Sequence, residues 1–311
     1  MTKDSVSAVQ NQPVANPFEG VDFGELEVSI YRPRTLASII LSNVITFMTF
    51  LALIPLFAVL WMLIWRGGQK LSLSLFTQLP PAPLEQGGGF GNAVIGTLIM
   101  VGLAALISMP IGVFTGVFLA EAKDSRLAAA VRFAAKVLTG FPSILAGVFA
   151  YGAAVLTMGG FSAVAGAIAL SILMIPTIIL TSESAVAMVP ARMKEASIGM
   201  GATSAQTVWM VLLPTAMPGI LTGIMLAVAR AAGETAPLLF TALFSNYWIT
   251  SGGGLTLIQP TASLAVLIYN FSGMPFENQR ELAWAAAFVL VLIVLVFNLI
   301  GQSFSRTQIQ Q

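Results

Sequence analysis

The chain alternates between long runs of apolar residues and shorter segments that hold most of its charge. Residues 36–65 and 90–120 contain no charged residue. Each run exceeds the roughly 20 residues that a helix needs to cross about 30 Å of hydrocarbon. The pattern predicts an all-α, polytopic membrane protein with six transmembrane helices, at residues 36–65, 90–120, 137–156, 164–182, 218–244 and 282–304.

The ends of the chain differ from this membrane domain, which we place at residues 35–306. Residues 1–34 are polar, and Pro13 and Pro17 would break an early helix, so we expect a mostly flexible N-terminal tail. A cleavable signal peptide is not expected, because about 30 polar residues precede an apolar run too long for a signal core. Residues 307–311 form a short C-terminal tail.

The distribution of Lys and Arg predicts the orientation of the helices. Arg66, Lys70 and Arg280 fall on one side of the predicted membrane, and Arg230 lies within a span. The other ten cations fall on the opposite side: Lys3, Arg32, Arg34, Lys123, Arg126, Arg132, Lys136, Arg192, Lys194 and Arg306. The cation-rich side is normally cytoplasmic, so both termini are predicted to be cytoplasmic.

The composition then excludes several kinds of functional site. The chain is 57% hydrophobic and 9% charged, and it has neither cysteine nor histidine. Disulfides, thiol nucleophiles, imidazole bases and the usual zinc sites are therefore excluded. No G-x-x-x-x-G-K-[ST] pattern occurs, and a net charge of +1 gives no reason to expect nucleic acid. We expect no catalytic residue, metal site or ATP site in this chain.

Two connecting regions have marked patterns. Residues 121–136 are amphipathic and basic, so we expect them to lie along the cytoplasmic surface before the third span. That span contains "TGFPSILAGVFAYG", whose small residues and Pro142 suit close helix packing or the lining of a pathway. Residues 264–269, in the segment after the fifth span, are apolar but too few to cross a membrane.

A third connecting region, residues 189–214, predicts two short helices joined by a turn. Pro190 suits the first turn of a helix, and Gly199 and Gly201 can supply positive φ angles. Thr203 with Gln206 fits a capping box, so a second helix is expected from Ser204 to Leu213, ending before Pro214.

This loop resembles the cytoplasmic signature of ABC importer permeases, in which E-A-A, a glycine and a final L-P stand at fixed spacing. The matching positions are Glu195, Ala196, Ser197, Gly201, Val211, Leu213 and Pro214, with Ser197 in place of the second alanine and Val211 in place of isoleucine. The resemblance implies that the loop docks on a separate ATPase subunit.

Three stretches resemble one group of these proteins, the phosphate importer permeases: "GILTGIMLAVARAAGETAPLLFTA", "GFPSILAG" and "VPARMKEASIGMGAT". The resemblance covers most of residues 36–304 and implies the type I ABC importer permease fold in the inner membrane. It also implies three partners: an ATPase dimer that carries ATP and Mg²⁺, a second related permease, and an extracytoplasmic phosphate-binding protein.

Arg230 and Glu234 stand out because they are opposite charges in an apolar span. Four residues apart, they share one helical face and can pair. Each would cost about 2.5 to 3.5 kcal/mol at the centre of a membrane helix, so they must face protein or water. They either fasten helices together as a neutralised pair, or Arg230 meets an oxyanion that Glu234 helps to hold or gate. Gly233 and Pro237 are expected to loosen and break the helix there.

The predicted function is the transmembrane subunit of an ATP-driven phosphate importer that works by alternating access. Three alternatives stay open: a permease for another oxyanion such as sulfate or molybdate, an ion-coupled carrier or channel, and a regulatory membrane scaffold. Glu183, just after the fourth span, is interpreted as a solvated charge at the cytoplasmic boundary.

Overall fold

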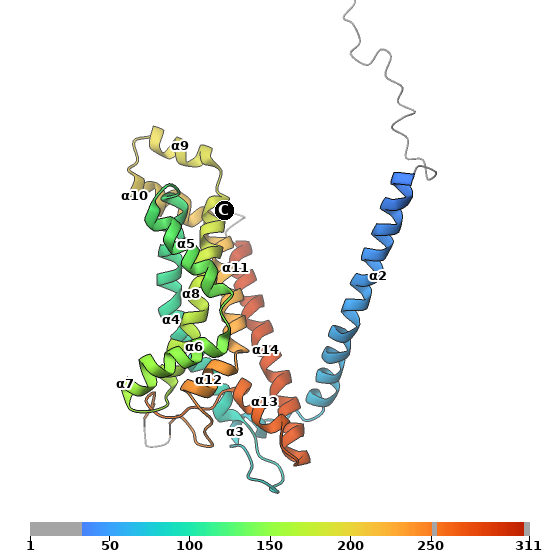
Figure 1. Ribbon diagram of the computed structural model, residues 1–311. Helices are drawn as coiled ribbons and strands as arrows, with labels where there is room; N and C mark the ends of the chain where they lie inside the picture. Colours follow the sequence, from blue (N-terminus) through green and yellow to red (C-terminus); the bar gives the residue numbers. More distant parts are fainter. Residues whose placement is uncertain (1–32, 251–253, 308–311) are drawn as a thin grey trace, which may run out of the picture. The chain divides into compact units, whose positions relative to one another are not determined.

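The computed structural model describes residues 33–250 and 254–307, and every regular element in these ranges is a helix (Figure 1). The predicted N-terminal tail, except for its last two residues, and residues 308–311 of the C-terminal tail lie outside the described residues. The chain divides into two units, Met1–Val59 and Leu60–Gln311. The first described helix, α2 (Pro33–Met62), continues into a wide π-helical turn, η2 (Leu63–Gly67), and matches the first predicted span.

Four long helices form the body of the second unit: α4 (Gly91–Glu121), α8 (Ala163–Ala187), α11 (Leu213–Ala232) and α14 (Glu277–Thr307). Helix α8 packs along α4 on one side and α11 on the other, and α11 also contacts α14. Glycines permit the close approach of α4 to α8. A methyl group at Gly112 would lie 2.5 Å from Ile178 Cγ2, and one at Gly116 would lie 2.6 Å from Ser182 Cβ.

The predicted third span is wrong as a single helix over residues 137–156. The chain instead forms α5 (Arg126–Thr139), a break, and then α6 (Ser143–Ala150), η3 (Tyr151–Val155) and α7 (Leu156–Met158), with a bend of 107°. Pro142 explains the break, because a proline disfavours helical geometry in the residue before it. Helix α5, expected on the membrane surface, packs against α8. Among residues 33–250 and 254–307, five helices are long and apolar enough to span, and the bent pair makes a sixth if it counts as one span.

The predicted fifth span also changes at both ends. The helix expected to stop before Pro214 instead runs on without interruption through α10 (Ser204–Thr207), η4 (Val208–Leu212) and α11. Pro214 cannot donate the usual helical hydrogen bond, and the wide turn of η4, which ends two residues before it, accommodates its ring. At the other end α11 stops at Ala232, and a separate helix, α12 (Ala236–Thr241), follows.

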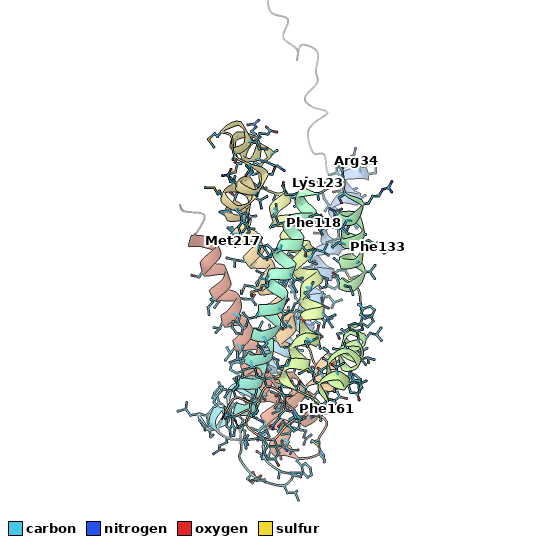
Figure 2. The ribbon with its side chains drawn as sticks, turned by 90° about the vertical axis from the view of Figure 1, so that its left-hand side faces the viewer. Arg34, Phe118, Lys123, Phe133, Phe161 and Met217 are labelled. Carbon is cyan, nitrogen blue, oxygen red and sulfur yellow. The ribbon has the colours of Figure 1, made fainter. Side chains whose placement is uncertain are left out.

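The two ends of the bundle carry different short helices. Helix α9 (Ala191–Gly199) lies with α10 at one end, and α3 (Ser74–Thr77) and α13 (Leu264–Ser272) lie at the other (Figure 1). Figure 2 places Phe118 of α4 and Lys123, two residues after α4, toward one end of the bundle and Phe161 at the opposite end. The apolar stretch 264–269 belongs to α13, a nine-residue helix packed on α14 and too short to be a candidate span.

Candidate coupling loop and embedded ion pair

The loop between α8 and α11 has most of the predicted local geometry. Thr203 accepts a hydrogen bond from the Gln206 backbone, and the Gln206 side chain accepts one from the Thr203 backbone, so the capping box is confirmed. Gly201 has a φ of +88°, whereas Gly199 ends α9 and does not have a positive φ. Pro190 is the residue before α9 and not part of its first turn. A single left-handed glycine therefore makes the turn between α9 and α10.

The signature residues divide between a solvent-facing surface and the packing beneath it. Glu195, Ala196 and Gly201 are exposed in this chain. Ser197 is buried, and its hydroxyl lies 3.0 Å from the Thr207 hydroxyl. The departure from alanine at Ser197 thus adds a hydrogen bond between α9 and α10. The exposed members form a surface on which another protein can dock.

The end of the loop signature lies on the long helix that leaves the loop. Leu213 is the first residue of α11, Pro214 is the second, and Val211 lies in η4. Since α10, η4 and α11 form one uninterrupted helical segment, a displacement of the α9–α10 turn would act directly on a membrane span.

Two ion pairs tie this loop and its surroundings to the end of the bundle from which α9 projects. Lys194 Nζ of α9 lies 2.6 Å from Glu121 Oε2, at the last residue of α4. Arg132 Nε of α5 lies 2.6 Å from Glu183 Oε1, and the same guanidinium donates to the Leu119 carbonyl.

The second of these pairs corrects the interpretation of Glu183. Its side chain is only 18% exposed, so it is not a solvated charge. No local spacing could reveal this, since Arg132 and Glu183 are 51 residues apart.

The embedded charges form the expected pair. Arg230 Nε lies 3.3 Å from Glu234 Oε1, four residues further along the chain. The Arg230 side chain is 45% exposed and that of Glu234 is 15% exposed. Arg230 stands two residues before the end of α11, and Glu234 lies in the break between α11 and α12, where Gly233 is the C-cap. The predicted helix break is present, and Pro237 lies in the first turn of α12.

The structure also brings together two of the stretches that resemble phosphate importer permeases. Helix α6, which follows Pro142, packs on α12. A methyl group at Gly147 would lie 2.6 Å from the Pro237 Cα, so the two backbones nearly touch. Pro142 and Gly147 thus hold a short helix directly against the segment that follows the ion pair.

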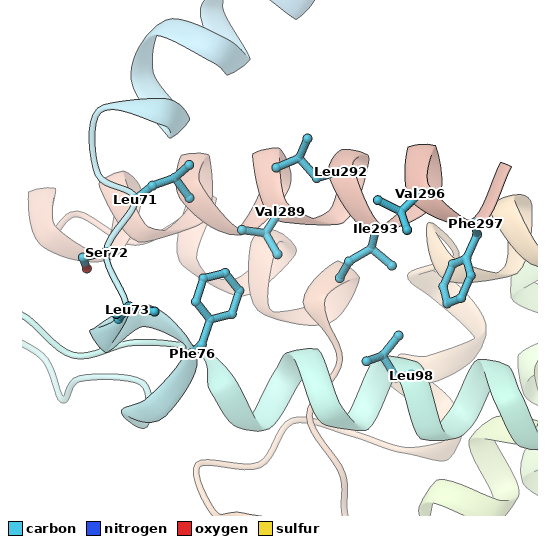
Figure 3. Close-up of a pocket in the computed structure, with 10 residues that line it drawn as sticks. All are labelled: Leu71, Ser72, Leu73, Phe76, Leu98, Val289, Leu292, Ile293, Val296 and Phe297. Carbon is cyan, nitrogen blue, oxygen red and sulfur yellow. The ribbon is translucent and has the colours of Figure 1, made fainter. Parts of the chain in front are cut away.

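A cavity of about 530 Å³ between α4, α14 and the segment at residues 71–76 is lined almost entirely by apolar residues (Figure 3). Leu98, Val289 and Phe297 are among its lining residues, and Ser72 is its one polar member. It has no charged lining residue that could hold an anion, so it is not a candidate for the substrate pathway.

Comparison with known proteins agrees with this architecture. Residues 112–309 match the family described as "Binding-protein-dependent transport system inner membrane component". The chain belongs to this family. It is therefore a subunit of a membrane transport system and a multi-pass inner membrane protein.

Within this family, the chain is similar to proteins named as phosphate transport system permeases. The chain is 42% identical over 247 residues to the phosphate transport system permease protein PstA of Haemophilus influenzae, covering 79% of this chain and 86% of that protein. It is 36% identical over 254 residues to the probable phosphate transport system permease protein PstA of Methanocaldococcus jannaschii, covering 80% of this chain and 86% of that protein.

Solved structures share the fold at lower sequence identity. A bacterial alginate ABC transporter chain matches with a TM-score of 0.60 and 17% identity, covering 89% of this chain and 96% of that one. A chain of the MetNI methionine ABC transporter matches with a TM-score of 0.54 and 23% identity, covering 70% of this chain and 94% of that one. The fold is that of type I ABC importer permeases.

Proposed function

We propose that this chain is the transmembrane subunit of an ATP-driven importer of inorganic phosphate. In this role it forms part of the translocation pathway by alternating access and has no ATP site of its own. Relatives with 36% to 42% identity that bear the name of phosphate permeases support the substrate. The structural observation that carries the proposal is Arg230, which lies on an open face of a spanning helix beside a helix break.

The surroundings of Arg230 restrict what can cover it. Thr222, Leu226 and Arg230 are exposed along one face of α11, while Ala227 and Ala231 are buried on the other. A guanidinium that faces lipid would cost a few kcal/mol, so this face belongs against another subunit or a water-filled pathway. Arg230 presents a planar fork of donors that matches the oxygens of phosphate, and Glu234 holds that fork in position.

The exposed residues of α9 supply the second half of the mechanism. We infer that Glu195, Ala196 and Gly201 dock on an ATPase dimer of the PstB type, which carries ATP and Mg²⁺. Closure of that dimer would displace α9. The displacement reaches the pathway through the continuous segment from α10 to α11 and reaches α4 through the Lys194–Glu121 ion pair.

Two further partners complete the proposed importer. A second permease of the PstC type would cover the open face of α11, and an extracytoplasmic binding protein would deliver phosphate. Both termini and α9 lie on the cytoplasmic side in this assembly, as the distribution of cations predicts.

Competition between oxyanions tests the substrate. The purified complex is placed in vesicles with ATP and the phosphate-binding protein, and uptake of radiolabelled phosphate is measured against unlabelled phosphate, sulfate and molybdate. We expect unlabelled phosphate alone to compete. Stronger inhibition of this uptake by sulfate or molybdate than by unlabelled phosphate would favour the alternative of a permease for another oxyanion.

A further inference from the structure

A polar cavity of about 430 Å³ lies between η2 and the first turns of α14, at the end of the bundle opposite α9. Arg66 and Lys70 line one wall and Arg280 lines the other, with Trp65 and Trp284 at their sides. These three cations are the same three that the sequence analysis places together on the extracytoplasmic side. Arg66 and Lys70 thus lie close to Arg280, more than 200 residues later in the chain, and the cavity carries three positive charges.

The walls of this cavity are held in close contact. A methyl group at Gly67 would lie 2.6 Å from the Trp284 carbonyl oxygen and 2.7 Å from Phe288 Cβ, so η2 rests directly on α14. The Arg66 guanidinium lies over the Trp284 ring, 5.7 Å from its centroid. Arg66 is thus positioned against α14 by packing and by a cation–π contact.

The charges in the cavity are only partly neutralised. Lys70 Nζ pairs with Glu281 Oε2 at 2.7 Å, and Glu277 is the other carboxylate in the lining. Within residues 33–250 and 254–307, no ion pair forms with Arg66 or Arg280. Three cations against two carboxylates leave a net positive charge, and two guanidinium forks are free to bind oxygens.

The sequences of both walls indicate the level in the membrane at which the cavity lies. Arg66 comes directly after the uncharged run 36–65, and the uncharged run 282–304 of α14 begins directly after Glu281. The cavity therefore lies where two apolar spans meet water, and tryptophan is enriched at that boundary. Phospholipid headgroups occupy this level of a membrane.

We propose that this cavity binds the phosphate group of an anionic phospholipid. The guanidinium groups of Arg66 and Arg280 hold the phosphate oxygens, and Trp65 and Trp284 pack beside the headgroup. Bound lipid would connect η2 to α14 at the membrane surface. Free phosphate offers the same oxygens, so the experiment separates the two sources.

The test uses the assembled complex in neutral detergent, titrated with phosphatidylglycerol and, separately, with phosphatidylcholine. Native mass spectrometry measures the bound lipid. Arg66→Gln combined with Arg280→Gln removes both forks, and Arg66→Lys combined with Arg280→Lys keeps the charge. Arg126→Gln combined with Lys136→Gln removes two exposed cations of α5 as the matched control. Recovery of the complex on purification shows that each variant assembles.

The wild-type complex and the α5 control should bind phosphatidylglycerol in preference to phosphatidylcholine. The double glutamine variant should bind phosphatidylglycerol roughly 30-fold more weakly, and the double lysine variant should fall in between. Equal phosphatidylglycerol affinity in the wild type and the double glutamine variant would overturn the proposal, and so would an equal loss in the α5 control.

A second arm measures binding of radiolabelled phosphate by equilibrium dialysis of the lipid-free complex. Unchanged phosphate binding in the double glutamine variant supports the lipid as the source of the phosphate group. If this variant loses phosphate binding and keeps phosphatidylglycerol, the cavity holds the free anion and the lipid proposal is wrong.

Discussion

Single charged residues show which ion pairs can be predicted from residue spacing and which cannot. Arg230 and Glu234 are four apart, so their pairing followed from the helical repeat, and the structure places them 3.3 Å apart. Glu183 was misread because its partner, Arg132, belongs to another helix. Lys194 and Glu121 are 73 residues apart, and no pattern in the sequence predicted that they pair. Contacts between elements depend on packing, which one sequence does not display.

Removing both charges of the embedded pair distinguishes the two roles that remain for it. If the pair only fastens helices, Arg230→Leu combined with Glu234→Leu should keep most transport, since replacing both members of a buried pair is often neutral. We expect the double variant to assemble and to lose phosphate uptake. Arg230→Lys should also be impaired, because lysine keeps the charge but loses the bidentate fork.

The measurement is phosphate uptake per assembled complex for the double variant, the two single leucine variants and Arg230→Lys. Arg126→Gln, which removes an exposed cation of α5, serves as the control and should transport normally. Near-normal uptake by the double leucine variant would show that Arg230 does not contact the substrate.

Helices and turns were predicted well where the apolar pattern is long and poorly where proline intervenes. The spans that became α4, α8 and α14 were located to within a few residues. Pro142 broke a predicted span, whereas Pro214 failed to end a predicted helix. The difference lies in the backbone around each proline: Phe141 and Pro142 lie outside the helices, with Pro142 as the N-cap of α6, while η4 widens ahead of Pro214. Proline marks such a position without specifying which outcome occurs.

The turn between α9 and α10 allows a matched test of backbone geometry. Neither Gly201 nor Gly199 has a neighbour that an added methyl group would meet, but only Gly201 has a positive φ. Gly201→Ala should cost roughly 1 to 2 kcal/mol of turn stability and weaken retention of the ATPase. Gly199→Ala should be neutral or slightly stabilising, because alanine favours the helix.

Pull-down of the ATPase with each alanine variant checks this prediction, with vesicle uptake as the second readout. Equal retention of the ATPase by the two variants would mean that the left-handed turn does not position the docking surface.

At the scale of the whole molecule, this chain has the features of one part of an assembly. Its fold was predictable because membrane crossing requires long apolar helices. The assembly was predictable only through resemblance, and the structure adds two open surfaces that we propose as its contacts. The exposed residues of α9 and the exposed face of α11 that carries Arg230 both lie open in the isolated chain.

Orientation can be measured directly because the chain contains no cysteine. Single cysteines are introduced at Gln86, in an exposed loop, and at Ser204, at the start of α10. An impermeant thiol reagent added outside intact cells should label Gln86→Cys and leave Ser204→Cys unlabelled until the membrane is opened. The reverse pattern would place α9 and its docking surface on the wrong side for a cytoplasmic ATPase.

The most direct test of the whole account measures phosphate accumulation and ATP hydrolysis in the same vesicles. The complex is reconstituted with the binding protein on one side and ATP on the other, with and without imposed proton or sodium gradients. We predict accumulation that requires ATP hydrolysis and proceeds without either gradient. Accumulation driven by an ion gradient in the absence of ATP would show an ion-coupled carrier, and ATP hydrolysis without any phosphate uptake would show a regulatory scaffold, so either result would contradict the account.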